Sequence, residues 1–327
     1  MVVAETGKNV LLRVKGLKTY FHSGGNPVRA VDDVSFDIYE RQTVALVGES
    51  GCGKSVTALS LARLVPQPPG YYAGGEILYR AQDVLRMNQA GLRRLRGKEI
   101  AFIFQEPGES LNPVFQVGQQ IGEAVRLHRR RVRVHDEVIR LMNLVGLPDP
   151  AVRMAAYPNE LSGGMQQRAM IAMALACNPK LLVADEPTTA LDVTIQAQIM
   201  LLLASLQKQL GMAVLLITHN LGLVADVAHW VNVMYAGRIV ESGTAEDVLS
   251  NPKHPYTQGL LEAVPRLEGA VGRLKGIEGQ VPNPAYLPAG CKFHPRCPRC
   301  QAICRDREPL REKVSETQAV KCHFWKS

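Results

Sequence analysis

The feature that most constrains this 327-residue chain is a glycine-rich octet, GESGCGKS, at Gly48–Ser55. Its glycines permit backbone angles that turn successive N–H groups inward and create a concave anion site at the start of a helix. Lys54 can reach the β- and γ-phosphates of a nucleotide, and the Ser55 hydroxyl can bind Mg²⁺. An apolar stretch at Thr43–Val47 predicts a buried parallel strand before the octet, and Val56–Leu64 predicts a helix after it.

In this setting the octet predicts nucleotide binding rather than a turn or a linker. The predicted contacts in this segment are Gly48, Ser50, Gly51, Gly53, Lys54, Ser55 and Val56.

Two acidic residues follow a second predicted apolar strand at Leu181–Ala184. We expect Asp185 to bind Mg²⁺ through water and Glu186 to act as the base that polarises the attacking water. Two solvated acids at a strand end are the simpler alternative. The apolar strand and the distant lysine-bearing loop favour the catalytic interpretation.

A third segment, LSGGMQQR at Leu161–Arg168, reads as the start of a helix over Met165–Cys177. Ser162 is a suitable N-cap, and two glycines allow the backbone to approach an anion closely. Even as a purely structural helix start, this segment favours phosphate contact.

In this order, GESGCGKS, LSGGMQQR and LLVADEP resemble the ATPases of ABC transporters, and the resemblance runs essentially from end to end. It implies an α/β P-loop NTPase core with an antiparallel β subdomain and a helical subdomain. It also implies that each nucleotide lies between the octet of one subunit and the LSGG helix of another, so activity requires a dimer. The implied contacts from the LSGG segment are Ser162, Gly163, Gly164 and Gln166.

The same resemblance assigns further positions. Gln105 matches the residue that senses Mg²⁺ and water and touches the membrane subunits; with Ser55 and Asp185 it completes the implied Mg²⁺ set. Asp192 matches the loop that crosses to the partner ATPase, and His219 matches the switch histidine that contacts the γ-phosphate.

Phe21 matches the aromatic residue whose ring stacks on adenine, with Tyr20 as the alternative. The chain departs from the usual family pattern at Cys52, where serine is common, and at Asn220, where aspartate is common. Neither departure removes a phosphate or Mg²⁺ ligand.

Three longer motifs are similar to the dipeptide and oligopeptide importer branch. They are ESLNPVFQVGQQI at Glu109–Ile121, NPKHPYTQGLLEAVP at Asn251–Pro265 and GCKFHPRCPRCQAIC at Gly290–Cys304. That branch implies an ATP-hydrolysing subunit that powers peptide import, and it also contains nickel and glutathione importers. The implied partners are a second, related ATPase, two membrane-spanning permease subunits and an extracytoplasmic binding protein.

Five of the seven cysteines lie in the tail. In a reducing compartment they favour thiolate ligands or inert thiols over disulfides. We expect Cys291, Cys297, Cys304 and Cys322 to hold a 4Fe–4S cluster, as the importer branch implies and as four thiolates permit. Zn²⁺ is the alternative, because Cys297 and Cys300 form a C-x-x-C pair. Cys300 is either a spare thiol or a replacement for one of the four, and unligated cysteines remain the simplest alternative.

Composition limits the location and the partners. No window approaches the roughly 18 uninterrupted apolar residues of a membrane helix, and no export signal is apparent at the N-terminus. We therefore expect peripheral attachment at the cytoplasmic face of the cell membrane.

The net charge of +8 comes partly from clusters at Arg93–Lys98 and Arg126–Arg133, which are typical of solvated helix faces or of surfaces near lipid. No nucleic-acid reader motif is visible, which disfavours a DNA-repair or translation ATPase.

The predicted organisation has four parts. Residues 1–105 contain the β subdomain and the octet, 106–160 the helical subdomain, 161–250 the LSGG, acidic and switch segments, and 251–327 a small cysteine-rich C-terminal module. Because the motif residues are all present, we expect hydrolysis rather than a cassette that only binds ATP.

Overall fold

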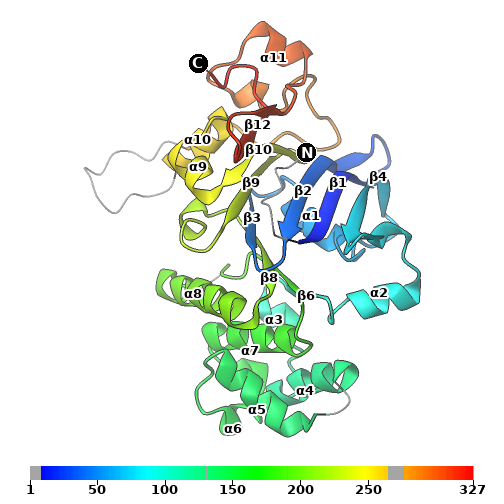
Figure 1. The fold of residues 1–327 in the computed structure, drawn as a ribbon, viewed down its shortest axis with the longest axis vertical. Coiled ribbons are helices and arrows are strands. Elements are labelled where there is room, and N and C mark those ends of the chain that lie inside the picture. Colours follow the sequence, from blue (N-terminus) through cyan, green and yellow to red (C-terminus); the bar gives the residue numbers. More distant parts are fainter. Residues whose placement is uncertain (1–8, 130–131, 190, 264–275, 327) are drawn as a thin grey trace. The chain divides into compact units, whose positions relative to one another are not determined.

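The computed structural model describes residues 9–129, 132–189, 191–263 and 276–326 (Figure 1). They fall into two compact units, one containing Met1–Met87 with Ile217–Ser327 and the other containing Asn88–Leu216. The basic cluster at 126–133 and the motif at 251–265 lie partly outside the described residues.

An antiparallel sheet occupies the N-terminal part of unit one. Strand β1 (Val10–Phe21) pairs with β2 (Val28–Tyr39) on one side and with β4 (Gly70–Tyr79) on the other, and β5 (Gln82–Asp83) follows β4. Alternating apolar residues at Asn9–Phe21 and Val28–Tyr39 predict two paired antiparallel strands, and the pairing of β1 with β2 confirms them. Those residues bury one face of the sheet, because successive side chains of a strand point to opposite faces.

The remaining strands of unit one lie in the order β11-β12-β10-β9-β3. The parallel pair β3 (Thr43–Val47) and β9 (Trp230–Tyr235) is buried, which confirms the apolar strand predicted before the octet. Strand β10 (Arg238–Thr244) pairs with β9 and with β12 (Gln318–Val320), and β12 pairs with β11 (Glu312–Lys313).

The tail is expected to form a small, loop-dominated, cysteine-rich module. Most of it is loop, but β12 lies beside β10 (Figure 1). Because the unpaired edge of β10 offers main-chain hydrogen bonds, the tail completes the sheet of unit one and does not stand apart from it. The helices of unit one are α1 (Lys54–Ser60), α9 (Ala245–Ser250), α10 (Pro255–Glu262) and α11 (Ala302–Asp306), with 3₁₀ turns η1 (Val84–Arg86), η3 (Leu221–Leu223) and η4 (His294–Arg296).

Helix α1 differs from its predicted span of Val56–Leu64. It begins two residues earlier because Gly53 (φ 103°) turns the chain directly into the helix. It ends at Ser60, after which the chain continues in turns.

Unit two carries the parallel strands β6 (Ile100–Ile103) and β7 (Leu181–Asp185). Strand β8 (Ala213–Thr218) begins in this unit, where the Ala213 N–H donates to the Lys180 carbonyl at 2.8 Å. The helices of unit two are α2 (Gln89–Leu95), α3 (Pro107–Ser110), α4 (Val117–His128), α5 (Val134–Leu144), α6 (Pro150–Arg153), α7 (Gly163–Leu175) and α8 (Val193–Leu210), with the 3₁₀ turn η2 (Pro158–Glu160).

The apolar spacing within Asp192–Leu210 predicts a helix with one buried stripe that ends at Gly211, and α8 confirms this end and part of the stripe. Gly211 caps it in the left-handed region (φ 62°). Ile199, Leu203 and Leu206 are buried, whereas Leu210 is 37% exposed because it lies in the last turn before this cap. The predicted stripe contained Ile195, Ile199, Leu202, Leu203, Leu206 and Leu210.

Three helices of unit two begin with the same pattern of glutamine hydrogen bonds. Gln120, Gln166 and Gln196 are the fourth residues of α4, α7 and α8, and each amide donates to the carbonyls eight and five residues before it. These bonds hold the loop that enters each helix. Among the described residues, no helix combines the length and the apolar character needed to cross a membrane.

Candidate functional site

The phosphate loop, residues 48–55, lies between β3 and α1 in unit one. A Cβ added at Gly53 would lie 2.1 Å from the Ala30 carbonyl oxygen, and one at Gly48 would lie 2.2 Å from that of Met234. Only glycine fits at either position. Gly51 (φ 77°) has open space around it instead, so the backbone of the loop is accessible at this residue. This is a cradle that suits a phosphate group.

Lys54 is buried within this loop. Its Nζ donates to the carbonyls of Gly48 (2.8 Å) and Glu49 (3.0 Å), which places a cation at the centre of the anion site. Cys52 is also buried, and burial raises the pKa of its thiol to about 11. The Cys52 side chain is therefore a neutral packing group, and replacing the usual serine changes no charge at the loop.

The two candidate aromatic residues differ in their contacts. The Tyr20 hydroxyl donates to Asp32 Oδ1 at 2.7 Å, and burial together with this bond raises the pKa of Tyr20 to about 12. Asp32 also accepts from Arg238 Nη2 at 2.7 Å. Phe21 belongs to no such polar network and is partly exposed. The structure therefore holds Tyr20 in a structural role and leaves the Phe21 ring as the better candidate for stacking.

The acidic residues lie at the end of β7 in unit two. Asp185 is buried, and Glu186 has a positive φ of 47°. A non-glycine residue in the left-handed region carries strain, which is common at functional sites. Glu186 Oε2 accepts from Thr189 Oγ1 (3.1 Å) and from Gln105 Nε2 (3.4 Å), so Gln105 and Glu186 are brought together as a pair.

The LSGG segment begins α7 in the same unit. Ser162 caps the helix through its hydroxyl, which accepts from the Met165 N–H at 3.4 Å. A Cβ at Gly164 would lie 3.0 Å from Ile195 at the start of α8. Asp192 caps α8 by accepting from the Ile195 N–H at 2.9 Å. The segment and Asp192 therefore lie at the starts of two helices that contact each other.

His219 follows β8 and is exposed. The next residue, Asn220, accepts from the Gly222 N–H at 3.0 Å and donates its own N–H to Thr218 Oγ1 at 3.0 Å. Asparagine at this position therefore serves the local turn and leaves the histidine side chain accessible. His219, Phe21 and the phosphate loop belong to unit one, whereas Gln105, Asp185, Glu186, Asp192 and the LSGG segment belong to unit two.

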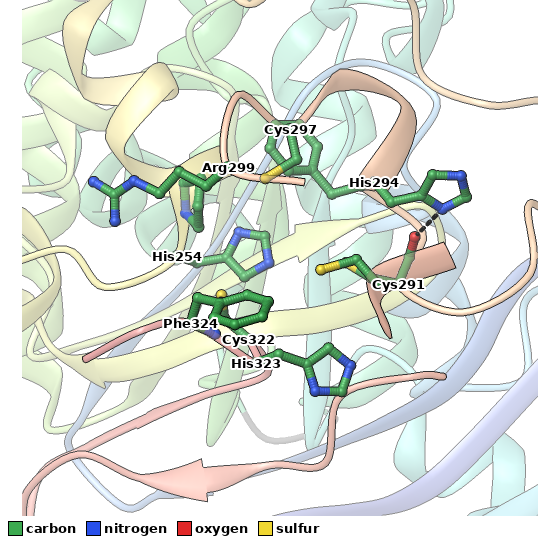
Figure 2. A pocket seen from close by; sticks show the side chains of 11 residues that line it. His254, Cys291, His294, Cys297, Arg299, Cys322, His323 and Phe324 are labelled. Atoms are coloured by element: carbon green, nitrogen blue, oxygen red, sulfur yellow. Dashed lines mark hydrogen bonds between the residues drawn. The ribbon is translucent and has the colours of Figure 1, made fainter. Parts of the chain in front are cut away.

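A second candidate site, the cysteine cavity, lies in the tail of unit one. Figure 2 shows Cys291, Cys297 and Cys322 around this small cavity, together with His254 and Phe324. Its lining comprises His254, Pro255, Cys291, Phe293, His294, Cys297, Arg299, Cys304, Cys322, His323 and Phe324.

All four cysteines predicted as ligands therefore line one cavity. Cys300 does not belong to the lining; its Sγ lies 3.7 Å from the Gln301 carbonyl. Backbone bonds support the arrangement, since the Cys291 N–H donates to the Cys304 carbonyl at 2.9 Å. Burial raises the pKa of Cys291 to about 11 and also raises the pKa values of Cys297 and Cys322.

A buried carboxylate holds the segment that leads to this cavity. Glu241 on β10 accepts from the N–H groups of Lys253 (2.7 Å) and His254 (2.9 Å) and from Gln318 Nε2 (2.9 Å). Burial lowers the pKa of His254 to about 3, so its ring is neutral and Nδ1 accepts from the Tyr256 N–H at 3.1 Å. Within the described residues, no group of three or more histidine, cysteine, aspartate or glutamate side chains is placed to hold a metal ion.

Two contacts at the nucleotide residues escaped the sequence reasoning. Thr189 orients Glu186, and its signal is a hydroxyl residue three positions after the predicted base. The Tyr256 hydroxyl accepts from the Glu49 N–H of the phosphate loop at 2.8 Å. Tyr256 lies in the HPYTQ motif, which is similar to the importer branch but does not by itself indicate a contact with the phosphate loop.

Comparisons with known proteins match these features. The ABC transporter family model matches residues 31–189, and a model described as the oligopeptide/dipeptide transporter C-terminal region matches residues 240–304. A putative peptide import ATP-binding protein of Brucella ovis is 49% identical, over 96% of this chain and 97% of that protein. The dipeptide transport ATP-binding protein DppD of Escherichia coli is 47% identical, over 96% of each chain.

Solved structures agree in fold. The ATP-binding cassette MJ0796, solved as a dimer bound to ADP and Pi, is 25% identical with a TM-score of 0.64, over 72% of this chain and 98% of that one. The cbiO1 structure from Clostridium perfringens is 24% identical with a TM-score of 0.64, over 74% of this chain and 92% of that one. The chain therefore belongs to the peptide-import ATP-binding proteins of the ABC transporter family and is an ABC-type ATPase.

Proposed function

We propose that this chain is the ATP-hydrolysing subunit of an importer that moves dipeptides or oligopeptides across the cell membrane. The observation that carries this proposal is the match of residues 240–304 to the peptide-transporter C-terminal region, on the same chain as a phosphate loop with a buried lysine. The names of the relatives from Brucella ovis and Escherichia coli support peptides as the solute. Nickel and glutathione are the alternative solutes, and a soluble ATPase acting on nucleic acid is a more distant one.

The nucleotide would be held mainly by unit one. Gly48, Gly51, Gly53 and Lys54 would surround the phosphates, and Phe21 would stack on adenine. Ser50 and Val56 complete the expected contacts of the loop. Bound Mg²⁺ would neutralise charge on the phosphates, and Ser55, Gln105 and Asp185 supply the oxygen ligands that it prefers.

Hydrolysis would depend on Glu186. Its carboxylate can accept a proton from the attacking water, while Thr189 and Gln105 hold it in place. His219 is the expected contact for the γ-phosphate, and the residue is exposed.

The active form would be a dimer in which each nucleotide also meets the LSGG helix of a partner. Ser162, Gly163, Gly164 and Gln166 would contact that nucleotide, and Asp192 would lie at the crossing point. The MJ0796 cassette forms a dimer that binds ADP and Pi, which supports this arrangement. We infer that the partner is a second, related ATPase.

Two permease subunits and an extracytoplasmic binding protein would complete the importer, with this chain at the cytoplasmic face of the membrane. The chain on either side of Gln105 exposes three large apolar side chains: Phe104 just before it, at 45%, and Val114 and Phe115 after it, at 70% and 52%. Exposed apolar groups of this size are typical of protein contacts. We infer that these side chains dock a permease.

We also infer that the chain consists of four functional parts, residues 1–105, 106–160, 161–250 and 251–327.

The cysteine cavity would hold a 4Fe–4S cluster. Its four cysteines are the ligand set of such a cluster, and Cys300 lies outside the lining. Zn²⁺ remains the alternative. It would require the four sulfur atoms to close around one ion.

Transport by the reconstituted complex tests the function. Vesicles containing the two permeases and both ATPases, supplied with binding protein and internal ATP, should take up a labelled dipeptide. Parallel assays with Ni²⁺ and glutathione decide between solutes. ATP-dependent uptake of Ni²⁺ or glutathione alone would refute the peptide proposal, and ATPase activity stimulated by DNA but not by permease would refute the importer.

A further inference from the structure

Arg296, in the tail, makes contacts that the proposed function does not explain. It ends the short turn η4, one residue before Cys297, and its side chain is only 5% exposed. All five N–H donors of its guanidinium have an acceptor. Nε donates to the Glu278 carbonyl (2.9 Å), Nη1 to Glu49 Oε2 (2.7 Å) and the Tyr235 hydroxyl (3.5 Å), and Nη2 to Glu49 Oε1 (3.0 Å) and the Ile277 carbonyl (3.2 Å).

The carboxylate in this set belongs to the phosphate loop. Glu49 is the second residue of the octet, and the tail segment holds both its side chain and its backbone. Arg296 binds the two carboxylate oxygens, and the Tyr256 hydroxyl accepts from the Glu49 N–H. The Glu49 carbonyl in turn accepts from Lys54 Nζ. One residue of the loop thus connects the tail to the lysine at the centre of the anion site.

Buried aromatic rings pack around this contact. The guanidinium lies 5.8 Å from the centroid of the Tyr235 ring, and the rings of Tyr235, Tyr256 and Phe293 pack with centroid distances of 4.6–5.4 Å. Tyr235, Tyr256 and Phe293 are fully or almost fully buried. A planar fork that meets a carboxylate through two parallel bonds is specific to arginine, because lysine has a single ammonium group.

The charge of Glu49 gives the contact a chemical consequence. A carboxylate in a phosphate loop repels an approaching triphosphate, and the low polarity of a partly buried site strengthens that repulsion. Paired with Arg296, Glu49 adds no net charge to the loop. Without Arg296, its carboxylate would be free to oppose Lys54.

We propose that Arg296 is a positioning residue for nucleotide binding: it neutralises Glu49 and, with Tyr256, fixes the first turn of the phosphate loop from the C-terminal tail. The inference rests on the proposed phosphate role of residues 48–55. It gives the peptide-transporter C-terminal region a direct function at the ATP site.

ATP affinity of the full-length protein, purified anaerobically, tests this proposal by titration. Arg296→Met should weaken ATP binding on the order of tenfold, the scale of coupling between contacting residues. Adding Glu49→Gln to Arg296→Met should recover most of the lost affinity, because it removes the unpaired charge. Arg296→Lys should fall between Arg296→Met and the wild type, since it keeps the charge but loses the fork.

The matched control is Arg311→Met. Arg311 is another tail arginine and donates to Ser242 Oγ at 3.1 Å on β10, without contacting the loop. It should retain wild-type ATP affinity. A general loss of tail packing would instead weaken binding in both arginine variants and would not be relieved by Glu49→Gln.

The proposal is overturned if Arg296→Met binds ATP like the wild type, or if the double variant binds no better than Arg296→Met. If Arg296→Met does not fold, Tyr256→Phe decides, because it removes a single oxygen from the same anchor; unchanged affinity would overturn the proposal. Lys54→Ala serves as the reference. Normal ATP binding by Lys54→Ala would refute the phosphate role of the loop itself, whereas a loss in Lys54→Ala alone would refute only the role of Arg296.

Discussion

The phosphate loop and the cysteine cavity are both built in unit one, but from different kinds of information. The loop comes from eight consecutive residues, and its lysine binds carbonyls five and six residues before it. The cavity gathers Cys291, Cys297, Cys304 and Cys322 with His254 from a preceding helix start. The first site is local in sequence, and the second exists only after the tail has folded onto the sheet.

This difference predicts different responses to change. A substitution in the loop should alter nucleotide chemistry and leave the tail folded. A substitution in the cavity should alter metal content and stability first, and reach the nucleotide only through the contacts of Arg296 and Tyr256 with Glu49.

Glu186→Gln should lower the rate of ATP hydrolysis by about two to four orders of magnitude while ATP still binds, because it removes the base and keeps size and polarity. Steady-state phosphate release by the assembled transporter, with the other nucleotide site inactivated, measures this. Turnover within a few-fold of wild type would show that another group acts as the base. Thr189→Val should produce a smaller loss, since Glu186 would lose the hydrogen bond from the Thr189 hydroxyl.

Lys54→Ala should weaken ATP binding by roughly thirtyfold or more, the scale for removing one partner from a buried charge pair. The loss should appear in affinity as well as in turnover, because the cation beside the phosphates is gone. Titration of the purified protein with ATP provides the measurement, and its iron content should match that of the wild type. A simultaneous loss of iron would contradict the separation of the two sites.

Phe21→Ala should weaken ATP binding by about 1–3 kcal/mol, the usual contribution of base stacking on an aromatic ring. Phe21→Tyr should bind nearly as well as the wild type. The matched comparison is Tyr20→Phe, which keeps a ring and removes only the hydroxyl bonded to Asp32. If Tyr20→Ala loses ATP binding and Phe21→Ala does not, the stacking ring lies one position earlier in the chain.

Cys297→Ser should abolish the proposed metal centre and have the smallest direct effect on ATP binding of these variants. Anaerobically purified wild-type protein should be brown, with iron and sulfide near four per chain, as a 4Fe–4S cluster requires. Cys300→Ser is the matched control and should stay brown, because Cys300 does not line the cavity. Colourless protein with one zinc would refute the cluster and keep the site, and metal-free folded protein would refute both.

Several site residues could be placed from the sequence because their geometry is local. Gly53 and Lys54 follow a buried strand and start a helix, so their positions depend on a few neighbouring dihedral angles. Glu186 and Ser162 likewise mark a strand end and a helix start. A pattern of residue types is sufficient for such features, since backbone conformation and chain connectivity impose them.

Helix boundaries and the exposure of side chains were harder to predict from the sequence. Helix α1 is shorter than its pattern indicated, and Leu210 is exposed although it continues the apolar stripe of α8. Periodicity shows which residues share a face, but it does not show how far the packing partner extends along the helix.

The sequence by itself determined the phosphate loop, the acidic strand end, the LSGG helix start and the family, because each is written in consecutive residues. Only the tertiary structure decided that the tail extends the sheet through β12, that Cys300 lies outside the cavity, and that Arg296 reaches Glu49. These contacts join residues up to 247 positions apart. Local sequence patterns do not indicate such long-range contacts, because these contacts depend on how the whole sheet brings its edges together.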